Sequence, residues 1–144
     1  MTCAKAAEGG HLDVLRWARE HGCPWAEDIE DAEQTDNMNC CSLAAEGGHL
    51  EVLTWAREHG CPWNETTCES AASSGHLAVL QWAREHHCPW DEWACCQAAR
   101  YGHLAVLQWA VAHGNPWNAI GCAQVADIQG HVDVARWVRA QSAL

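Results

Sequence analysis

The sequence predicts an all-α fold, namely a helical-repeat solenoid of about five helix-turn-helix units in 144 residues. One sixteen-residue phrase recurs along the chain, and a second, shorter helical pattern precedes each copy. The Gly-His pairs that open the phrase have their histidines at positions 11, 49, 76, 103 and 131, which gives steps of 38, 27, 27 and 28 residues. A period between about 20 and 50 residues is typical of solenoids. The copies are Gly10–Trp25, Gly48–Trp63, Gly75–Trp90 and Gly102–Trp117, with a partial fifth copy from Gly130.

The recurring phrase itself predicts the second helix of each unit. Apolar residues fall at helical spacings with charged residues between them, so the helix has one broad apolar face. Gly60 stands where a left-handed helix end is favoured, and Pro62 prevents continuation. In the third copy His87 replaces the glycine, which predicts a strained or differently formed helix end. The apolar positions in the second copy are Leu50, Val52, Leu53, Trp55 and Ala56.

A shorter helix is predicted to open each unit. Asn64, Asp91 and Asn118 follow the loop tryptophans and are good N-cap residues, because their side-chain oxygens accept backbone N–H groups. Small residues three and four apart, as in Cys68…Ala71-Ala72, indicate a helix packed closely on both sides. The Gly-His pair then makes a tight turn into the second helix. The extra residue in the last step is expected in this turn, within 127–130.

These patterns predict a single repeat domain over residues 1–144. Its units are expected at about 1–25, 37–63, 64–90, 91–117 and 118–144. Residues 26–36 form an insertion in which six of the eleven residues are acidic. This segment is interpreted as a solvated loop or the remnant of a decayed unit, or alternatively as a docking element for a basic partner.

The phrase resembles the ankyrin repeat. The stretch from Ala44 to Leu53, Ala-Ala-Glu-Gly-Gly-His-Leu-Glu-Val-Leu, and the loop His59-Gly-Cys-Pro-Trp63 match ankyrin motifs at the same offsets in four copies. The unit of 27 residues is about six shorter than a standard ankyrin repeat. The missing part lies where the β-finger would be, so the resemblance implies an ankyrin-like solenoid without β-fingers.

The resemblance also implies a binding surface. In ankyrin proteins the end of the first helix often faces the ligand, and there the copies of this chain differ from one another. Tyr and Arg are also enriched in interface hot spots. Ordinary surface drift is the alternative explanation of the variation. The protein-contact candidates are Ser73, Ser74, Arg100 and Tyr101, followed by Glu46 and Glu8.

The composition excludes several classes of function. A formal net charge of −11 argues against nucleic acid as a partner, because phosphate binding needs a basic surface. No apolar run is long enough to span a membrane, and the N-terminus lacks the apolar stretch of a secretory signal. Most of the ten cysteines recur in register with the repeat, as core residues do. A cytoplasmic, reducing location is therefore expected.

The sequence predicts no enzyme and no cofactor. The turn histidines occupy one structural position five times, whereas an active site needs a single special place. The loop pairs His21/Cys23, His59/Cys61 and His86/Cys88 are metal-ligand types, yet each loop offers only two of the four ligands that Zn²⁺ takes. Small buried thiols are the favoured interpretation, so no metal site is expected. A Cys/His metal-binding or redox protein is kept as a third hypothesis.

The tryptophans are expected to form packing ladders between units. The chain has ten tryptophans and no phenylalanine, and nine of the ten share two repeat positions. Trp93 lies off both ladders and is expected to be exposed. The second-helix position holds Trp17, Trp55, Trp82, Trp109 and Trp137, and the loop position holds Trp25, Trp63, Trp90 and Trp117.

The predicted function is a non-catalytic protein–protein interaction scaffold whose partner is another protein. The alternative is a structural subunit that self-assembles head-to-tail. Solenoids normally end in polar capping units, and the first unit lacks one, so a longer array or another subunit is expected to cover its N-terminal face.

Overall fold

The computed structural model describes residues 3–25 and 39–142, and within these ranges all regular secondary structure is helical. The predicted all-α class is confirmed for this part of the chain. The acidic insertion 26–36 lies outside the described residues. None of the helices described is long and apolar enough to cross a membrane.

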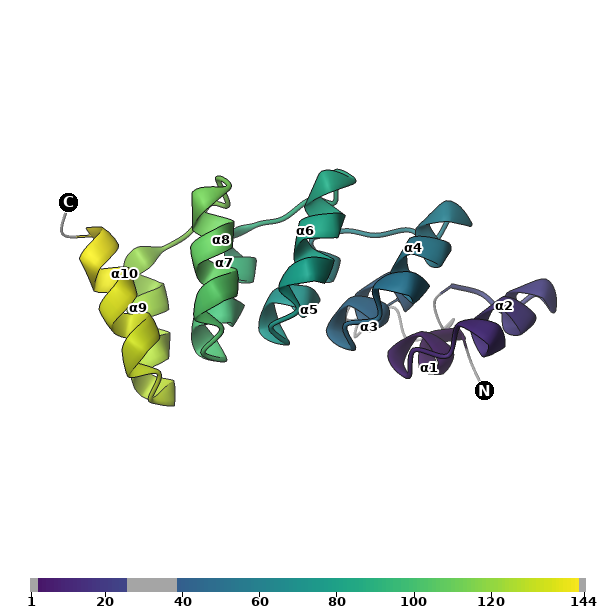
Figure 1. Ribbon diagram of the computed structural model, residues 1–144, viewed down its shortest axis with the longest axis horizontal. Helices are drawn as coiled ribbons and strands as arrows, with labels where there is room; N and C mark the ends of the chain where they lie inside the picture. Colours follow the sequence, from purple (N-terminus) through teal and green to yellow (C-terminus); the bar gives the residue numbers. More distant parts are fainter. Residues whose placement is uncertain (1–2, 26–38, 143–144) are drawn as a thin grey trace, which may run out of the picture.

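The ten helices within residues 3–25 and 39–142 lie in pairs that follow one another in a row along the chain (Figure 1). Each odd-numbered helix packs on the even-numbered helix that follows it, and also on the odd-numbered helices of the neighbouring pairs. The odd-numbered helices, called first helices here, are α1 (Cys3–Glu8), α3 (Cys40–Glu46), α5 (Glu65–Ser73), α7 (Glu92–Arg100) and α9 (Ala119–Gln129). The second helices are α2 (Leu12–Glu20), α4 (Leu50–Glu58), α6 (Leu77–Glu85), α8 (Leu104–Ala112) and α10 (Val132–Ser142).

Small side chains fill the spaces between neighbouring first helices. Paired alanines in α1, α3, α5 and α7 are fully buried, with no exposed surface. Because alanine adds little bulk, the first helices approach one another closely. The second helices α2, α4, α6 and α8 each add a buried leucine to this core, and α10 adds Val134 and Val138. The alanine pairs are Ala6-Ala7, Ala44-Ala45, Ala71-Ala72 and Ala98-Ala99, and the leucines are Leu15, Leu53, Leu80 and Leu107.

Three of the first helices, α5, α7 and α9, begin at the predicted side-chain caps. The side-chain oxygens of Asn64 and Asp91 accept the backbone N–H groups of Thr66 and Trp93, each at 3.0 Å. Asn118 accepts from Gly121 at the same distance. Asn39 caps α3 and shares a reciprocal capping box with Ser42. Each cap satisfies a backbone donor that lacks a partner within its helix.

The second helices α2, α4, α6 and α8 end in the predicted left-handed residue. Gly60 has φ of +88°, and the next N–H, that of Cys61, donates back to the carbonyl of Ala56 at 2.9 Å. This hydrogen bond is the signature of a Schellman-type helix end. His87 takes the same conformation with φ of +65°, and it is the one non-glycine residue with positive φ in the part of the chain described. The expected strain is therefore present, and the helix end keeps its usual form.

The extra residue of the last unit is accommodated differently from our expectation. We placed it in the turn at 127–130, but α9 runs to Gln129 and has eleven residues, whereas α5 and α7 have nine. The helix absorbs the residue because each added residue brings one further backbone hydrogen bond. Gly130 then closes α9 with φ of +81°.

The strain at His87 gives a direct prediction. His87→Gly should raise the free energy of unfolding by about 1 kcal/mol, because a side chain in the left-handed region is strained whereas glycine is not. Gly60→His, the reverse change at the equivalent position, should lower it by a similar amount. Urea unfolding followed by circular dichroism measures both. Equal stability of His87→Gly and the parent chain would contradict the assignment of strain.

Candidate functional site

The six contact candidates lie at the ends of four adjacent first helices. Glu8 and Glu46 end α1 and α3, Ser73 ends α5, and Arg100 ends α7. Ser74 and Tyr101 are the next residues and cap their helices. Because α1, α3, α5 and α7 pack in this order, the six residues follow one edge of the structure. We call this set the helix-end row: Glu8, Glu46, Ser73, Ser74, Arg100 and Tyr101.

The side chains of the helix-end row make few contacts with the rest of the protein. Glu8 accepts from the Lys5 ammonium at 3.1 Å, and the Ser73 hydroxyl donates to the carbonyl of Ser70 at 3.1 Å. The Arg100 guanidinium lies 5.7 Å from the centre of the Tyr101 ring. The two serines are half-buried and the other four residues are exposed, with 51% of Tyr101 accessible. The row is therefore open to contact from outside.

The charge of the helix-end row changes sign along its length. Glu8 and Glu46 are carboxylates, Ser73 and Ser74 are neutral, and Arg100 is a cation beside an aromatic ring. The order follows the helices from α1 to α7. An elongated surface with one acidic and one basic end distinguishes the two directions in which an extended ligand can lie.

A contact between histidine and glycine joins each pair to the next. A Cβ atom added to Gly10 would lie 2.5 Å from Nδ1 of His49, in the following pair. The same test at Gly48, Gly75 and Gly102 gives 2.7, 2.6 and 2.6 Å to the rings of His76, His103 and His131. Real Cβ atoms do not approach other atoms this closely. Only glycine therefore allows the next imidazole to lie against the turn, and we call this arrangement the His–Gly contact.

The same imidazoles hold the backbone of the helix-end row. Nε2 of His49 lies 3.0 Å from the carbonyl oxygen of Glu8, and Nε2 of His103 lies 3.0 Å from that of Ser73. Because a carbonyl only accepts, Nε2–H is the donor in each case. We expected these histidines to bond backbone within the inter-helix turn. They do bond backbone, but the carbonyl lies at the end of the first helix of the preceding pair, in α1 for His49 and in α5 for His103.

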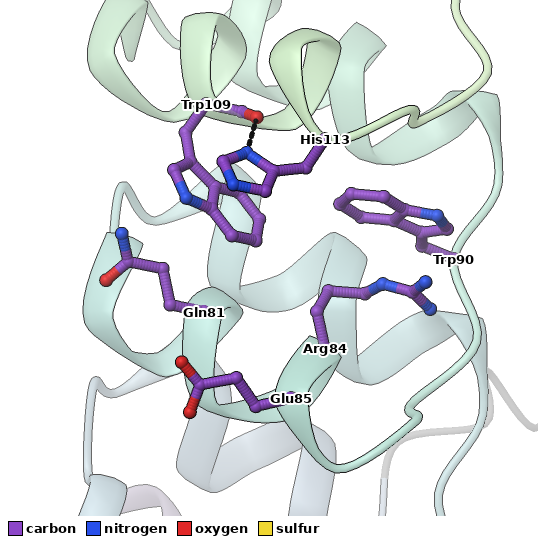
Figure 2. Close-up of a pocket in the computed structure, with 6 residues that line it drawn as sticks. All are labelled: Gln81, Arg84, Glu85, Trp90, Trp109 and His113. Carbon is purple, nitrogen blue, oxygen red and sulfur yellow. Dashed lines mark hydrogen bonds between the residues drawn. The ribbon is translucent and has the colours of Figure 1, made fainter.

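On the second-helix side, an open groove of about 440 Å³ lies between α6 and α8 (Figure 2). Trp90 meets Trp109 edge to face, with ring centroids 5.9 Å apart. His113 stacks on Trp109 at 4.2 Å, and its Nδ1–H donates to the Trp109 carbonyl at 2.8 Å. The Arg84 guanidinium lies over the Trp90 ring at 4.2 Å. Gln81 and Glu85 complete the lining.

This aromatic arrangement repeats at the other joints, so it is chiefly a packing device. The first two loop tryptophans each pack edge to face on the second-helix tryptophan of the next pair. The ring centroids lie 5.9 Å apart for Trp25 and Trp55 and 5.8 Å apart for Trp63 and Trp82. The fourth loop tryptophan, Trp117, packs against Trp137 at 6.0 Å. The predicted tryptophan ladders between units are thus confirmed at four joints.

Sequence reasoning missed the role of the second-helix arginines. Arg57 lies 4.2 Å over the ring of Trp63 and donates to the carbonyl of Cys61, so it fixes the loop to its helix. The signal was present in the spacing Arg-x-x-x-Cys-Pro-Trp, which occurs three times. The fourth copy has Val111 in the arginine position.

Comparison with family models and with curated proteins gave no match to this sequence.

All ten cysteines are free thiols, and eight of them are buried in the core, whereas Cys23 and Cys96 are half-buried. Cys41 donates to the carbonyl of Cys61 at 3.8 Å, and Cys3 makes the equivalent contact with Cys23 at 3.7 Å. In the fourth loop Asn115 replaces the cysteine. Its side-chain oxygen accepts from the Cys95 thiol at 3.1 Å, and its amide nitrogen donates to the backbone carbonyl of Asp91. Within residues 3–25 and 39–142, no three His, Cys, Asp or Glu side chains are arranged to hold a metal ion.

Burial makes these thiols difficult to ionise. Burial, with a smaller contribution from neighbouring cysteines, raises the pKa of Cys95 to about 12 and that of Cys122 to about 11. The thiolate is the reactive form of cysteine, so these side chains are poor nucleophiles in the folded protein.

The His–Gly contact predicts that alanine substitution destabilises the protein much more at one glycine than at another with the same backbone conformation. Gly75→Ala should destabilise the protein by about 3 kcal/mol, since strain and a clash with His103 add together. Gly114→Ala should cost only about 1 kcal/mol, because a Cβ there meets nothing within 4 Å and only the strain remains. Chemical unfolding of the two variants measures this difference. Equal losses would show that the imidazole does not need the glycine.

The raised thiol pKa values predict a loss of stability at alkaline pH. Above about pH 9 the unfolded chain releases thiol protons that the folded chain retains, so unfolding becomes easier as the pH rises. Each such thiol contributes a slope of about 1.4 kcal/mol per pH unit. Cys122→Ala should therefore flatten the decline between pH 9 and its folded pKa of about 11. Urea unfolding across this range tests the effect, and an unchanged slope would contradict it.

Proposed function

We propose that this chain is an ankyrin-like helical-repeat solenoid of five units that serves as a non-catalytic protein–protein interaction scaffold. In this proposal the helix-end row binds another protein. The observation that carries it is the contrast between constant and variable positions. The His–Gly contact recurs at four joints, whereas the side chains beside it read Glu, Glu, Ser-Ser and Arg-Tyr. Repeat scaffolds place function in such variable surface residues.

The chemistry of the row supports a protein ligand of defined direction. Arg100 and Tyr101 are exposed and adjacent, and both residue types anchor protein interfaces. Glu8 and Glu46 at the other end favour basic groups on the ligand. We infer an extended segment whose basic end lies over α1 and α3 and whose acidic or aromatic end lies over α7.

The backbone supports a preorganised surface. The carbonyls of Glu8 and Ser73 are held by histidines of other helix pairs, so the row loses little conformational freedom on binding. Preorganisation of this kind raises affinity because less entropy is lost when the complex forms. The buried free thiols fit a reducing compartment, and we propose a cytoplasmic location on that ground.

The experiment is a peptide-display selection on the immobilised full chain under reducing conditions. The selected peptides should share a basic segment followed by an acidic or aromatic one. Their affinity should fall about tenfold or more for Arg100→Glu, which corresponds to about 1.4 kcal/mol, and also for Tyr101→Ala. Fluorescence anisotropy of labelled peptides measures this change.

Arg136→Glu is the matched control. It makes the same charge change on an exposed arginine of α10, away from the helix-end row. It should leave the affinity nearly unchanged. If Arg136→Glu and Arg100→Glu weaken binding equally, the net charge governs binding and the row is not the site.

A further inference from the structure

The first helix pair exposes three side chains whose equivalents are covered in every later pair. Val14 is 37% exposed, whereas the equivalent valines of α4, α6, α8 and α10 are at most 2% exposed. Trp17 is 60% exposed, and its equivalents are all half-buried. His11 is exposed too, whereas the later turn histidines are half-buried. We call His11, Val14 and Trp17 the leading face.

The internal joints show what covers such a face. At each joint the histidine lies against a glycine of the preceding pair, as His49 does on Gly10. The second-helix tryptophan packs against the loop tryptophan of the preceding pair, as Trp55 does on Trp25. The natural occupant of a leading face is therefore the far side of another helix pair of the same kind.

The last helix pair offers that far side uncovered. Gly130 has φ of +81°, like the glycines of the four His–Gly contacts, but a Cβ added there would meet nothing within 4 Å. Beside it, Val132 is 63% exposed, whereas the equivalent leucines Leu12, Leu50, Leu77 and Leu104 of the earlier pairs are half-buried. We call Gly130 and Val132 the trailing face. It combines an unoccupied glycine position with apolar surface.

We propose that the leading face of one chain binds the trailing face of a second copy, with His11 placed against Gly130 of that copy. The contact reproduces the His–Gly contact that the chain makes four times internally. It uses the ends of the row of helix pairs and leaves the helix-end row free. The proposal is therefore independent of the protein–protein function assigned above.

The end-to-end joint is weaker than an internal one. At internal joints the second-helix tryptophan packs on a loop tryptophan, and the proposed joint between His11 and Gly130 does not include such a pair. The internal joints are also linked covalently, whereas two chains lose translational and rotational freedom when they associate. Association should consequently be reversible and dependent on concentration.

The geometry and the charge of the chain define how association behaves. A leading face and a trailing face are different surfaces, so the contact is heterologous and leaves a free face at both ends of a dimer. Larger oligomers follow as the concentration rises. The formal net charge of −11 makes the chains repel each other, and added salt should therefore promote association by screening.

Sedimentation velocity of the full chain in reducing buffer, over a wide concentration range and at two salt concentrations, tests the proposal. The parent chain should show a weight-average sedimentation coefficient that rises with protein concentration and with salt concentration. Gly130→Ala should weaken association about tenfold or more, because the added methyl group occupies the position of His11. Gly114→Ala is the matched control, since it has φ of +82° and equally open surroundings but no histidine to receive.

A second pair of variants separates loss of contact from loss of folding. Trp17→Ala should weaken association, while Trp93→Ala, which removes an indole 54% exposed on α7, should not. Circular dichroism checks that all four variants keep their helix content. A mass that stays monomeric at every concentration, or equal behaviour of Gly130→Ala and Gly114→Ala, would overturn the proposal. Oligomers that disappear only on adding further reductant would also overturn it, because they would be disulfide-linked.

Discussion

The rest of the structure depends on the imidazole ring that lies against the glycine of the preceding turn. This one contact satisfies two demands at the same point. The glycine reverses the chain between two helices with a positive φ that other residues adopt with strain. Its missing side chain also leaves space for a ring from the next helix pair. The turn within one pair and the joint between two pairs are therefore specified by the same Gly-His dipeptide.

The core makes such specific joints necessary. Between the first helices it consists mainly of alanine and cysteine, which remove less apolar surface from water than leucine or phenylalanine would. The large apolar area lies on the second-helix side, in the contacts between loop and helix tryptophans. Arginines over three of the loop rings hold those loops in place. Stability thus comes from repeated joints more than from any one pair, as expected for stacked repeats.

Much of the fold could be predicted because its signals are local. The caps at Asn64, Asp91 and Asn118 and the left-handed helix end at Gly60 depend on residues a few positions apart. The hydrogen bond from His49 to the carbonyl of Glu8 joins residues 41 positions apart in the sequence, so no local pattern encodes it. The extension of α9 was missed for a related reason, because the sequence pattern accommodates an extra residue in a turn as well as in a helix. The helix-end row could be placed from the repeat, but the chemistry of the partner that we propose for it is not encoded in any spacing.

The same contact explains how constant and variable positions coexist within a few residues. A carbonyl accepts a hydrogen bond whatever side chain its residue carries, so the bonds from His49 and His103 place no demand on the side chains of Glu8 and Ser73. The helix ends are held by backbone, and the side chains there are free to differ between pairs. A residue whose side chain made the joint could not vary without loss of stability. This separation of backbone contact from side-chain identity supports the role in recognition that we propose for this edge.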